Sequence, residues 1–460
     1  MRNVALIVLD SVRKDVFDEV STRLRAKADV EYDQCRAPST WSVPSHASIL
    51  TGELPHNHGV DTYNRQYNDI SASDTFLDGL PDHRSIGVSA NVFAGEAFGF
   101  DQFFDEFVSI SADRRFPEGM DAAKFGLESD EDGLRKQLSF VQEALKHEHS
   151  LRSLLNGALV TVDEVTKQLP FPKPLDKGGA AVCRAIERET TGPEREEPFF
   201  LFANIMDAHG PLTPTRGFDH DFYDAPSSWR SEDIDWDRVI KVDEEIELER
   251  YHGLYRAAVD YLDQRVSTLI DTIQQRTDRP TTFLITADHG ENMGSATDDQ
   301  LWEHSESSLT EGLLHVPAIV VNPPGKPPSD LGNYVSQLAL GNLLTGFAHD
   351  EYPDITSEAI AAERIGSNKS DPKRERIVRC VYRGETKYCW DNFGVQRRFH
   401  LDWGTPSWQE EVDGEVPIDE LETQFFSNNI ETALDVAVDD ERGDELDEST
   451  ERKLQDLGYV

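Results

Sequence analysis

Short apolar runs alternate with helical patterns along the chain. Continuous apolar runs occupy residues 4–9, 198–206, 281–287 and 318–321. Such runs have no polar face, which is typical of strands buried on both sides of a parallel sheet. Between them, residues 180–189 and 247–275 place apolar side chains at helical spacing. Strands that alternate with helices predict an α/β fold built on a doubly wound sheet.

The same pattern divides the chain into regions. Residues 377–382 and 386–390 flank Arg383-Gly384-Glu385 and predict a β-hairpin. We therefore expect one large domain, an irregular insertion within it, a polar linker and a small C-terminal α+β subdomain that ends in an acidic tail. Their predicted bounds are 1–345, about 106–175, 346–376 and 377–460.

The excess of acidic residues limits the kinds of molecule that the protein can bind. The chain has 460 residues, with 45 Lys and Arg against 87 Asp and Glu, a formal net charge of −42. Binding to nucleic acid is excluded in practice because it requires basic clusters. Hydrophobic residues make up 38%, enough for a large core, so the acidity indicates a carboxylate-coated surface. Such surfaces keep halophilic proteins soluble, and we expect a halophilic protein; an acidic mesophilic protein is the alternative.

The N-terminal apolar run and the cysteines indicate where in the cell the protein is expected. The run over residues 4–9 is too short for a signal peptide core or a membrane span. The chain's four cysteines are scattered, with no disulfide or zinc-site spacing. We expect a cytoplasmic protein without a transmembrane segment and leave its oligomeric state open.

Polar residues follow the apolar runs at their carboxyl ends. Asp10 ends the first run, His209 follows the second, and Asp288 and His289 follow the third. In open α/β sheets, ligands bind beyond the carboxyl ends of the strands, so we expect these side chains to converge. Carboxylates with an imidazole form a reasonable shell for a divalent metal. For Asp10 alone, capping of a helix is the alternative.

Residues 38–52 hold the most informative segment. Pro44 suits the first turn of a helix over residues 45–50, and Gly52 suits its end. Ser42 then lies at the helix N-terminus, where free N–H groups stabilise an oxyanion. His46 lies one turn further along the same face. The alternative is that Ser42 only caps the helix.

Taken together, these motifs resemble the sulfatase branch of the alkaline phosphatase superfamily, in order and spacing over most of the chain. The resemblance implies a large mixed sheet with helices on both faces. It rests on the segments 9–13, 42–52, 209–211, 286–291, 301–304, 313–320 and 454–460.

The resemblance also implies roles for individual residues. Ser42 holds the nucleophile position of the family's Cys/Ser-x-Pro-x-Arg motif, where sulfatases carry formylglycine and phosphate-handling relatives an unmodified hydroxyl. Asp10, Asp288 and His289 match metal ligands, and Ser42 would touch the same ion. His209 and His304 match groups that contact the ester oxygens or protonate the leaving group.

Three positions depart from the family pattern. His46 replaces the motif Arg, and we count it with Ser42, His209 and His304 among the catalytic residues. Glu53 replaces a frequent Lys, and Ser11 replaces a frequent second Asp. These changes imply a metal ion that is held by few protein ligands. They also place the conversion of Ser42 to formylglycine in question. Ca²⁺, Mg²⁺, Mn²⁺ and Zn²⁺ are the candidate ions, with the imidazole favouring the last two.

The sequence thus predicts a metal-dependent hydrolase of sulfate or phosphate esters, acting on an anionic small molecule or glycan. One alternative is a transferase that passes a phospho-group from Ser42 to a glycan or lipid head group. The other is a non-catalytic binding relative.

Overall fold

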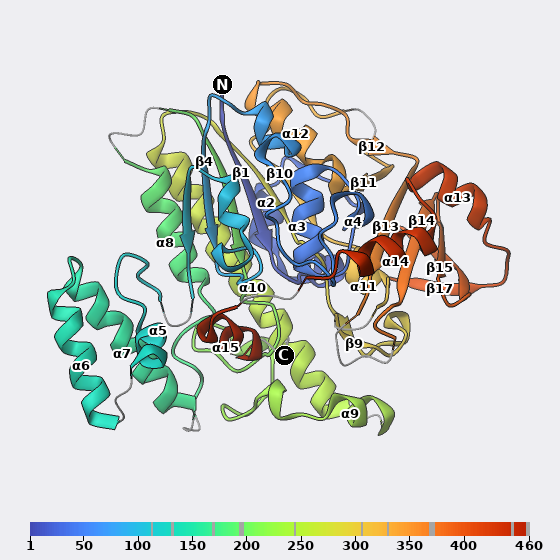
Figure 1. Ribbon diagram of the computed structural model, residues 1–460. Coiled ribbons are helices and arrows are strands. Elements are labelled where there is room, and N and C mark those ends of the chain that lie inside the picture. Colours follow the sequence, from blue (N-terminus) through green and yellow to red (C-terminus); the bar gives the residue numbers. More distant parts are fainter. Residues whose placement is uncertain are drawn as a thin grey trace.

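A computed structural model describes residues 1–111, 114–129, 133–167, 171–192, 197–242, 245–304, 307–328, 331–367, 373–442 and 446–456. Its centre is a seven-stranded sheet in the order β2-β10-β7-β1-β6-β4-β5 (Figure 1). The parallel strands are β1 (Asn3–Leu9), β4 (Arg84–Ser89), β5 (Glu106–Ser109), β6 (Phe199–Ile205) and β7 (Thr281–Thr286). β10 (Ala318–Val321) runs antiparallel to β7, and β2 (Val30–Glu31) runs antiparallel to β10. The predicted mixed sheet is confirmed.

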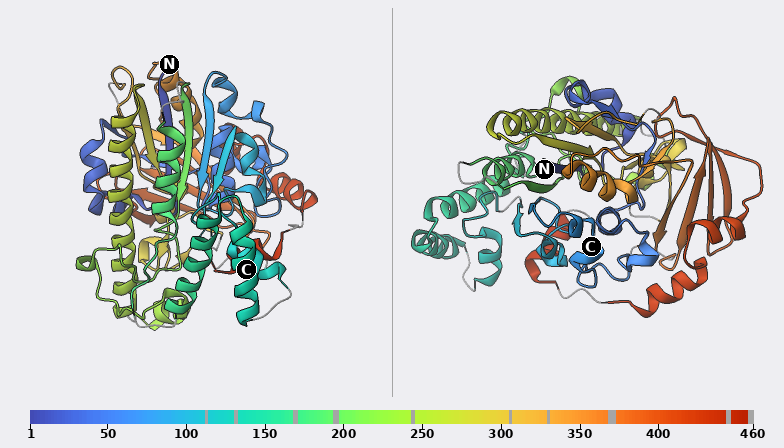
Figure 2. Two further views of the ribbon diagram at one scale, coloured as in Figure 1. Left: turned by 90° about the vertical axis from the view of Figure 1, so that its left-hand side faces the viewer. Right: turned by 90° about the horizontal axis from the view of Figure 1, so that it is seen from above.

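Helices cover both faces of this sheet, as Figure 2 shows. One face carries α1 (Lys14–Val20), α2 (Thr22–Lys27), α8 (Gly179–Thr190) and α10 (Glu245–Arg276). The other carries α3 (Ser42–Thr51) and α12 (Leu340–Ala348). Every residue of β1, β6 and β7 is buried, as expected for strands between two helical layers.

Two small sheets and several short helices accompany the main sheet and its helical layers. A three-stranded sheet joins β12 (Thr356–Ser357), β11 (Tyr334–Ser336) and β3 (Cys35–Arg36), and a two-stranded sheet joins β8 (Asn292–Met293) and β9 (Trp302–Glu303). The remaining short helices are α4 (Pro55–His58), α9 (Trp236–Val242) and α11 (Glu311–Leu314).

The region expected as an insertion begins inside the main sheet, because β5 is its edge strand. The same region holds the helices α5 (Ala122–Glu128), α6 (Gly133–Lys146) and α7 (Ser150–Lys167), which lie beside the main body in Figure 1. Phe140 of α6 is buried, and its ring packs on Phe125 of α5.

The C-terminal region is an antiparallel sheet with two helices, which confirms the predicted α+β character. Its strands are β13 (Ala359–Ile365), β14 (Ile377–Arg383), β15 (Thr386–Asp391), β16 (Gln396–Leu401) and β17 (Gln409–Val412), and its helices are α13 (Ile418–Phe425) and α14 (Ile430–Asp439). The expected hairpin is β14–β15.

The linker prediction differs from the structure, because residues 359–365 form β13. Glu363 and Arg364 interrupt the apolar pattern of this strand, yet both are buried. Arg379 on β14 donates to Glu363 at 3.0 Å, which offsets the burial of the carboxylate.

The acidic tail also differs from a loose segment. Its helix α15 (Glu448–Asp456) packs near α5, with Leu454 fully buried. Residues 457–460, the end of the motif at 454–460, lie outside the described residues. None of the described helices combines the length and apolar composition needed to cross a membrane.

Candidate active site

Three adjacent parallel strands end at one edge of the main sheet. β1 lies between β6 and β7, so the residues that follow these strands share that edge. Asp10 follows β1, His209 lies just beyond β6, and Asp288 and His289 lie just beyond β7. The convergence expected from the sequence is thus produced by strand order.

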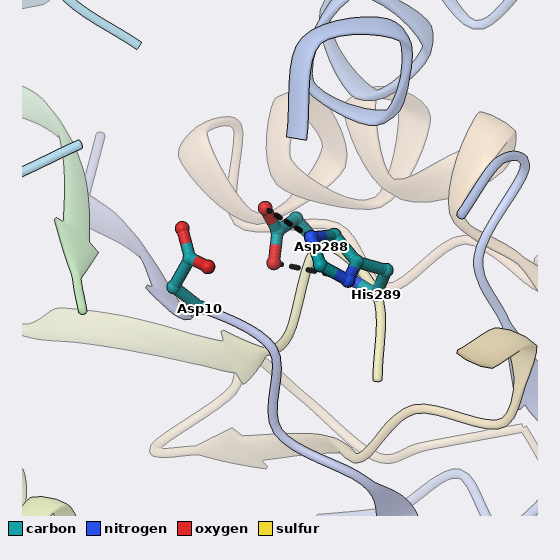
Figure 3. A group of neighbouring side chains, drawn as sticks. All are labelled: Asp10, Asp288 and His289. Carbon is teal, nitrogen blue, oxygen red and sulfur yellow. Dashed lines mark hydrogen bonds and ion pairs between the residues drawn. The ribbon is translucent and has the colours of Figure 1, made fainter. Parts of the chain in front are cut away.

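Asp10, Asp288 and His289 form a compact buried group in which each offers one ligand atom within 4.8 Å of the others. Figure 3 shows the Asp288 carboxylate between Asp10 and the His289 ring. Asp288 Oδ2 and His289 Nε2 are buried and have no hydrogen-bond partner among the described residues. Unsatisfied buried polar atoms are costly, and a carboxylate oxygen and an imidazole nitrogen are both metal donors. This donor set fits a divalent cation.

The backbone orients these donors. Ser11, with φ 60°, points its N–H at Asp288 Oδ1 (3.2 Å), and His289 N–H donates to the same oxygen (3.0 Å). His289 Nδ1 lies 2.7 Å from the Gly290 carbonyl oxygen, which places the proton on Nδ1 and the lone pair on Nε2. A Cβ on Gly290 would lie 2.0 Å from Gly312 O, so only glycine allows this turn.

Two asparagines hold Asp10. Its Oδ2 accepts from Asn91 Nδ2 at 2.6 Å and from Asn204 Nδ2 at 3.1 Å. Burial raises the pKa of Asp10, but the neighbouring His209, His289 and other groups outweigh it and lower the pKa to about 2. Asp10 is therefore ionised at neutral pH.

Ser42 is the first residue of α3 and lies beside Asp10. Asn91 Nδ2 also donates to Ser42 Oγ at 3.0 Å, so one amide bridges the two side chains. His46, one turn along α3, accepts from Asn204 Nδ2 at 3.3 Å through Nε2, which lies 4.0 Å from Asp288 Oδ2. Burial lowers the pKa of His46 although Asp288 and Asp10 oppose the shift. His46 is thus a neutral side chain within the group.

His209 and His304 complete the site. Their rings are 5.2 Å apart, and the His304 ring is 4.6 Å from that of His289. His304 Nδ1 lies 2.9 Å from Glu291 Oε1, and His209 Nδ1 lies 2.6 Å from Gly210 O. Burial lowers the pKa of His209 to about 4 and that of His304 well below its usual value.

All seven residues predicted from the sequence therefore lie in one connected group. Three further residues of this group were not predicted from the sequence: Asn91, Asn204 and Lys177. The Lys177 ammonium donates to the His209 carbonyl oxygen. Asn204 carried a usable signal, because it is the one amide in the apolar strand β6. Asn91 and Lys177 lie in loops without a recognisable pattern.

Comparisons with known proteins agree with this fold. Residues 182–348 match the family model described as Sulfatase. A phosphonate monoester hydrolase from Silicibacter pomeroyi superposes with a TM-score of 0.58 at 13% identity, over 91% of this chain and 90% of that chain. A protein of the alkaline phosphatase superfamily from Vibrio parahaemolyticus gives 0.50 at 13% identity, over 100% and 88%.

A third solved structure, in complex with its substrate D-glucosamine-2-N,6-O-disulfate, gives a TM-score of 0.56 at 11% identity, over 97% of this chain and 99% of that chain. At these identities the likeness establishes the fold. Among curated proteins, none matches the sequence significantly.

The chain therefore has the alkaline phosphatase-like fold, and its residues 182–348 match the sulfatase family model, as the predicted resemblance implied.

Proposed function

We propose that this chain is a metal-dependent hydrolase of sulfate or phosphate esters in which Ser42, or a formylglycine made from it, is the nucleophile. One observation carries the proposal. The Asn91 amide bridges Ser42 Oγ and Asp10, beside two buried donor atoms, on Asp288 and His289, that have no partner among the described residues. If Ser42 only capped the helix, its hydroxyl would not need to lie beside this amide bridge and these two donor atoms.

Asp10, Asp288 and His289 are the proposed metal ligands. When bound there, a divalent cation supplies positive charge that neutralises ester oxygens and favours the ionised nucleophile. The two carboxylates balance the charge of such an ion, and the imidazole favours Mn²⁺ or Zn²⁺ over ions that prefer oxygen ligands alone.

The position of Ser42 supports its role as nucleophile. It opens a ten-residue helix, so the positive end of the helix dipole faces its oxygen. The Asn91 N–H is a further donor to this oxygen and stabilises charge that develops on it during attack.

His209 and His304 are placed to handle the leaving group. The Gly210 carbonyl holds the proton of His209 on Nδ1, so Nε2 is the nitrogen that exchanges a proton with substrate. Glu291 orients His304 in the same way through its Nδ1. One of these rings can take up the proton of the Ser42 hydroxyl on Nε2 and pass it to the departing oxygen, which balances the step.

The test is a panel of p-nitrophenyl esters: sulfate, phosphate, phosphodiester and phosphonate monoester. A sulfated glucosamine joins the panel because a structural neighbour was solved with one. Each is assayed with Ca²⁺, Mg²⁺, Mn²⁺ and Zn²⁺. We expect turnover of at least one ester. A protein that binds an ion tightly but cleaves none of them is a binding relative, and the proposal fails.

Two additions refine the assay. Glycerol or a sugar acceptor shows whether the group is transferred to an alcohol instead of water, which would identify a transferase. The mass of the peptide that contains Ser42, from protein made in its native host, distinguishes formylglycine (lighter by two hydrogens) from unmodified serine. We expect serine, because His46 replaces the motif Arg.

A further inference from the structure

Carboxyl groups gather at the proposed metal site. Asp10, Asp288 and Glu291 are all fully buried there. A cationic side chain beside the transferred group would offset the repulsion between these groups and an anionic ester.

Two buried arginines near the site are already engaged. Arg13 pairs with Asp15 and Asp298 and donates to the Glu291 carbonyl oxygen. Arg364 donates to Thr40 Oγ1 at 3.0 Å and to His304 O at 2.6 Å. Both guanidinium groups are thus engaged by the protein's own acceptors.

Lys177 differs from these arginines. Its ammonium lies against the His209 backbone, and its charge also acts on Asp10 and Glu303. Among the described residues it has one hydrogen-bond acceptor, the His209 carbonyl oxygen, for its three N–H donors. The residue is only partly buried.

The backbone of Lys177 is fixed. Its N–H donates to Asp207 Oδ1 at 3.0 Å, and the flanking Asp176 accepts from Ala180 N at 2.8 Å at the start of α8. Gly179 fits against Asp207, since a Cβ there would lie 2.3 Å from Asp207 Oδ2. These contacts fix the backbone at Lys177, and a side chain that binds a ligand requires such a fixed backbone.

We propose that the Lys177 ammonium binds a non-reacting anionic oxygen of the ester, so that the site selects substrates whose transferred group is fully charged. This inference rests on the proposed function. Burial and the nearby Lys173 lower the pKa of Lys177 to about 7, while Asp207, Asp10 and Glu232 raise it. An anionic oxygen beside Lys177 stabilises its charged form, so the lysine and the substrate stabilise each other.

The test compares Lys177→Met, Lys177→Arg and a control, Lys27→Met. Lys27 pairs with Asp271 on α10, so its replacement removes the same charge away from the site. Binding of inorganic phosphate to the metal-loaded protein is measured by calorimetry, and kcat and KM are measured on the active esters.

Lys177→Met should weaken phosphate binding about ten- to hundredfold, the effect of removing a charged hydrogen-bond partner. The loss in kcat/KM should be larger for a dianionic phosphate monoester than for a monoanionic sulfate ester. Lys177→Arg should recover most of the binding, and Lys27→Met should match the unsubstituted protein.

Unchanged phosphate binding in Lys177→Met would overturn the inference. So would a fall in thermal stability and kcat that Lys177→Arg does not rescue, because that pattern indicates only support of the His209 loop. Phosphate binding does not depend on turnover, so failure of the proposed hydrolase activity is recognised separately, by the ester panel.

Discussion

Asn91 Nδ2 donates to Ser42 Oγ at 3.0 Å while it also holds Asp10 Oδ2 at 2.6 Å. Removal of the amide therefore acts on the proposed nucleophile and on a proposed metal ligand together. For Asn91→Ala we expect kcat/KM to fall about 10²- to 10³-fold, the usual effect of losing one oxyanion donor. Steady-state kinetics at saturating metal measures this. An unchanged kcat/KM would show that the bridge has no part in turnover.

Metal removal gives the second prediction. Dialysis against a chelator should abolish ester cleavage and lower Tm, because an ion that binds only the folded state stabilises it, by about 2.7 kcal/mol at a hundred times its Kd. Return of a divalent ion should restore both. In Asp288→Asn the added ion should no longer raise Tm, which tests the assigned ligand directly. Full activity in a metal-free sample would refute the ligand assignment.

The turn at Gly290 gives the third prediction. A Cβ at this position would lie 2.0 Å from Gly312 O, so Gly290→Ala must shift the backbone that carries Asp288 and His289. We expect loss of metal binding and activity. Gly126→Ala on α5 is the matched control, because no atom lies within 4 Å of its Cβ position and alanine favours a helix. Equal activity of the two variants would contradict this prediction.

A stability prediction concerns Asp61, whose carboxyl group is buried in the loop after α4. Burial raises its pKa from 3.8 to about 7, although backbone N–H groups of Tyr63 and Asn64 donate to its Oδ1. The folded state thus holds a proton that the unfolded state loses near pH 4. The resulting stability declines as pH rises from about 4 to 7 and is absent above that range.

Asp61→Asn keeps the acceptor oxygen without the charge. We expect the variant to exceed the unsubstituted protein in stability at pH 8 by more than about 1 kcal/mol, since each pKa unit corresponds to about 1.4 kcal/mol. The difference should shrink towards pH 5. Thermal melts at both pH values measure it, and parallel pH profiles of the two proteins would argue against a buried titrating carboxyl.

Salt dependence follows from the net charge of −42. Such a protein repels an anionic ester at long range, and 1 M salt screens this repulsion because the Debye length is then about 3 Å. We expect activity to rise steeply between low and molar salt, measured with KCl and NaCl. Full activity at low ionic strength would be inconsistent with a halophilic protein.

The strands that were predicted from the sequence are those whose side chains are buried among apolar groups on both faces of the sheet. β1, β6, β7 and β10 appeared as mainly apolar runs because helices or strands cover them on every side. β4 (Arg84–Ser89) was missed because only Ile86 and Val88 among its residues carry large apolar side chains. β13 was missed because its charge pairs form only in the folded state.

Some residues of the site were predictable from the sequence and others were not. Asp10, Ser42 and Asp288 were predictable because each directly follows or opens a regular element that the pattern reveals. Asn91 and Lys177 were not, because each reaches the site from a loop whose path depends on tertiary packing. The bridge from the Asn91 amide to the end of β1 and the start of α3 follows no periodic pattern in the sequence.

The most direct measurement is the activity of Ser42→Ala on the best ester, compared with Ser45→Ala. Ser45 lies in the same helix, and its buried hydroxyl has no hydrogen-bond partner among the described residues, so the control removes the same atom from α3. We predict that Ser42→Ala reduces kcat to background while metal binding and Tm are kept, and that Ser45→Ala stays active. Full activity of Ser42→Ala on every ester that the unsubstituted protein cleaves would contradict the proposed mechanism.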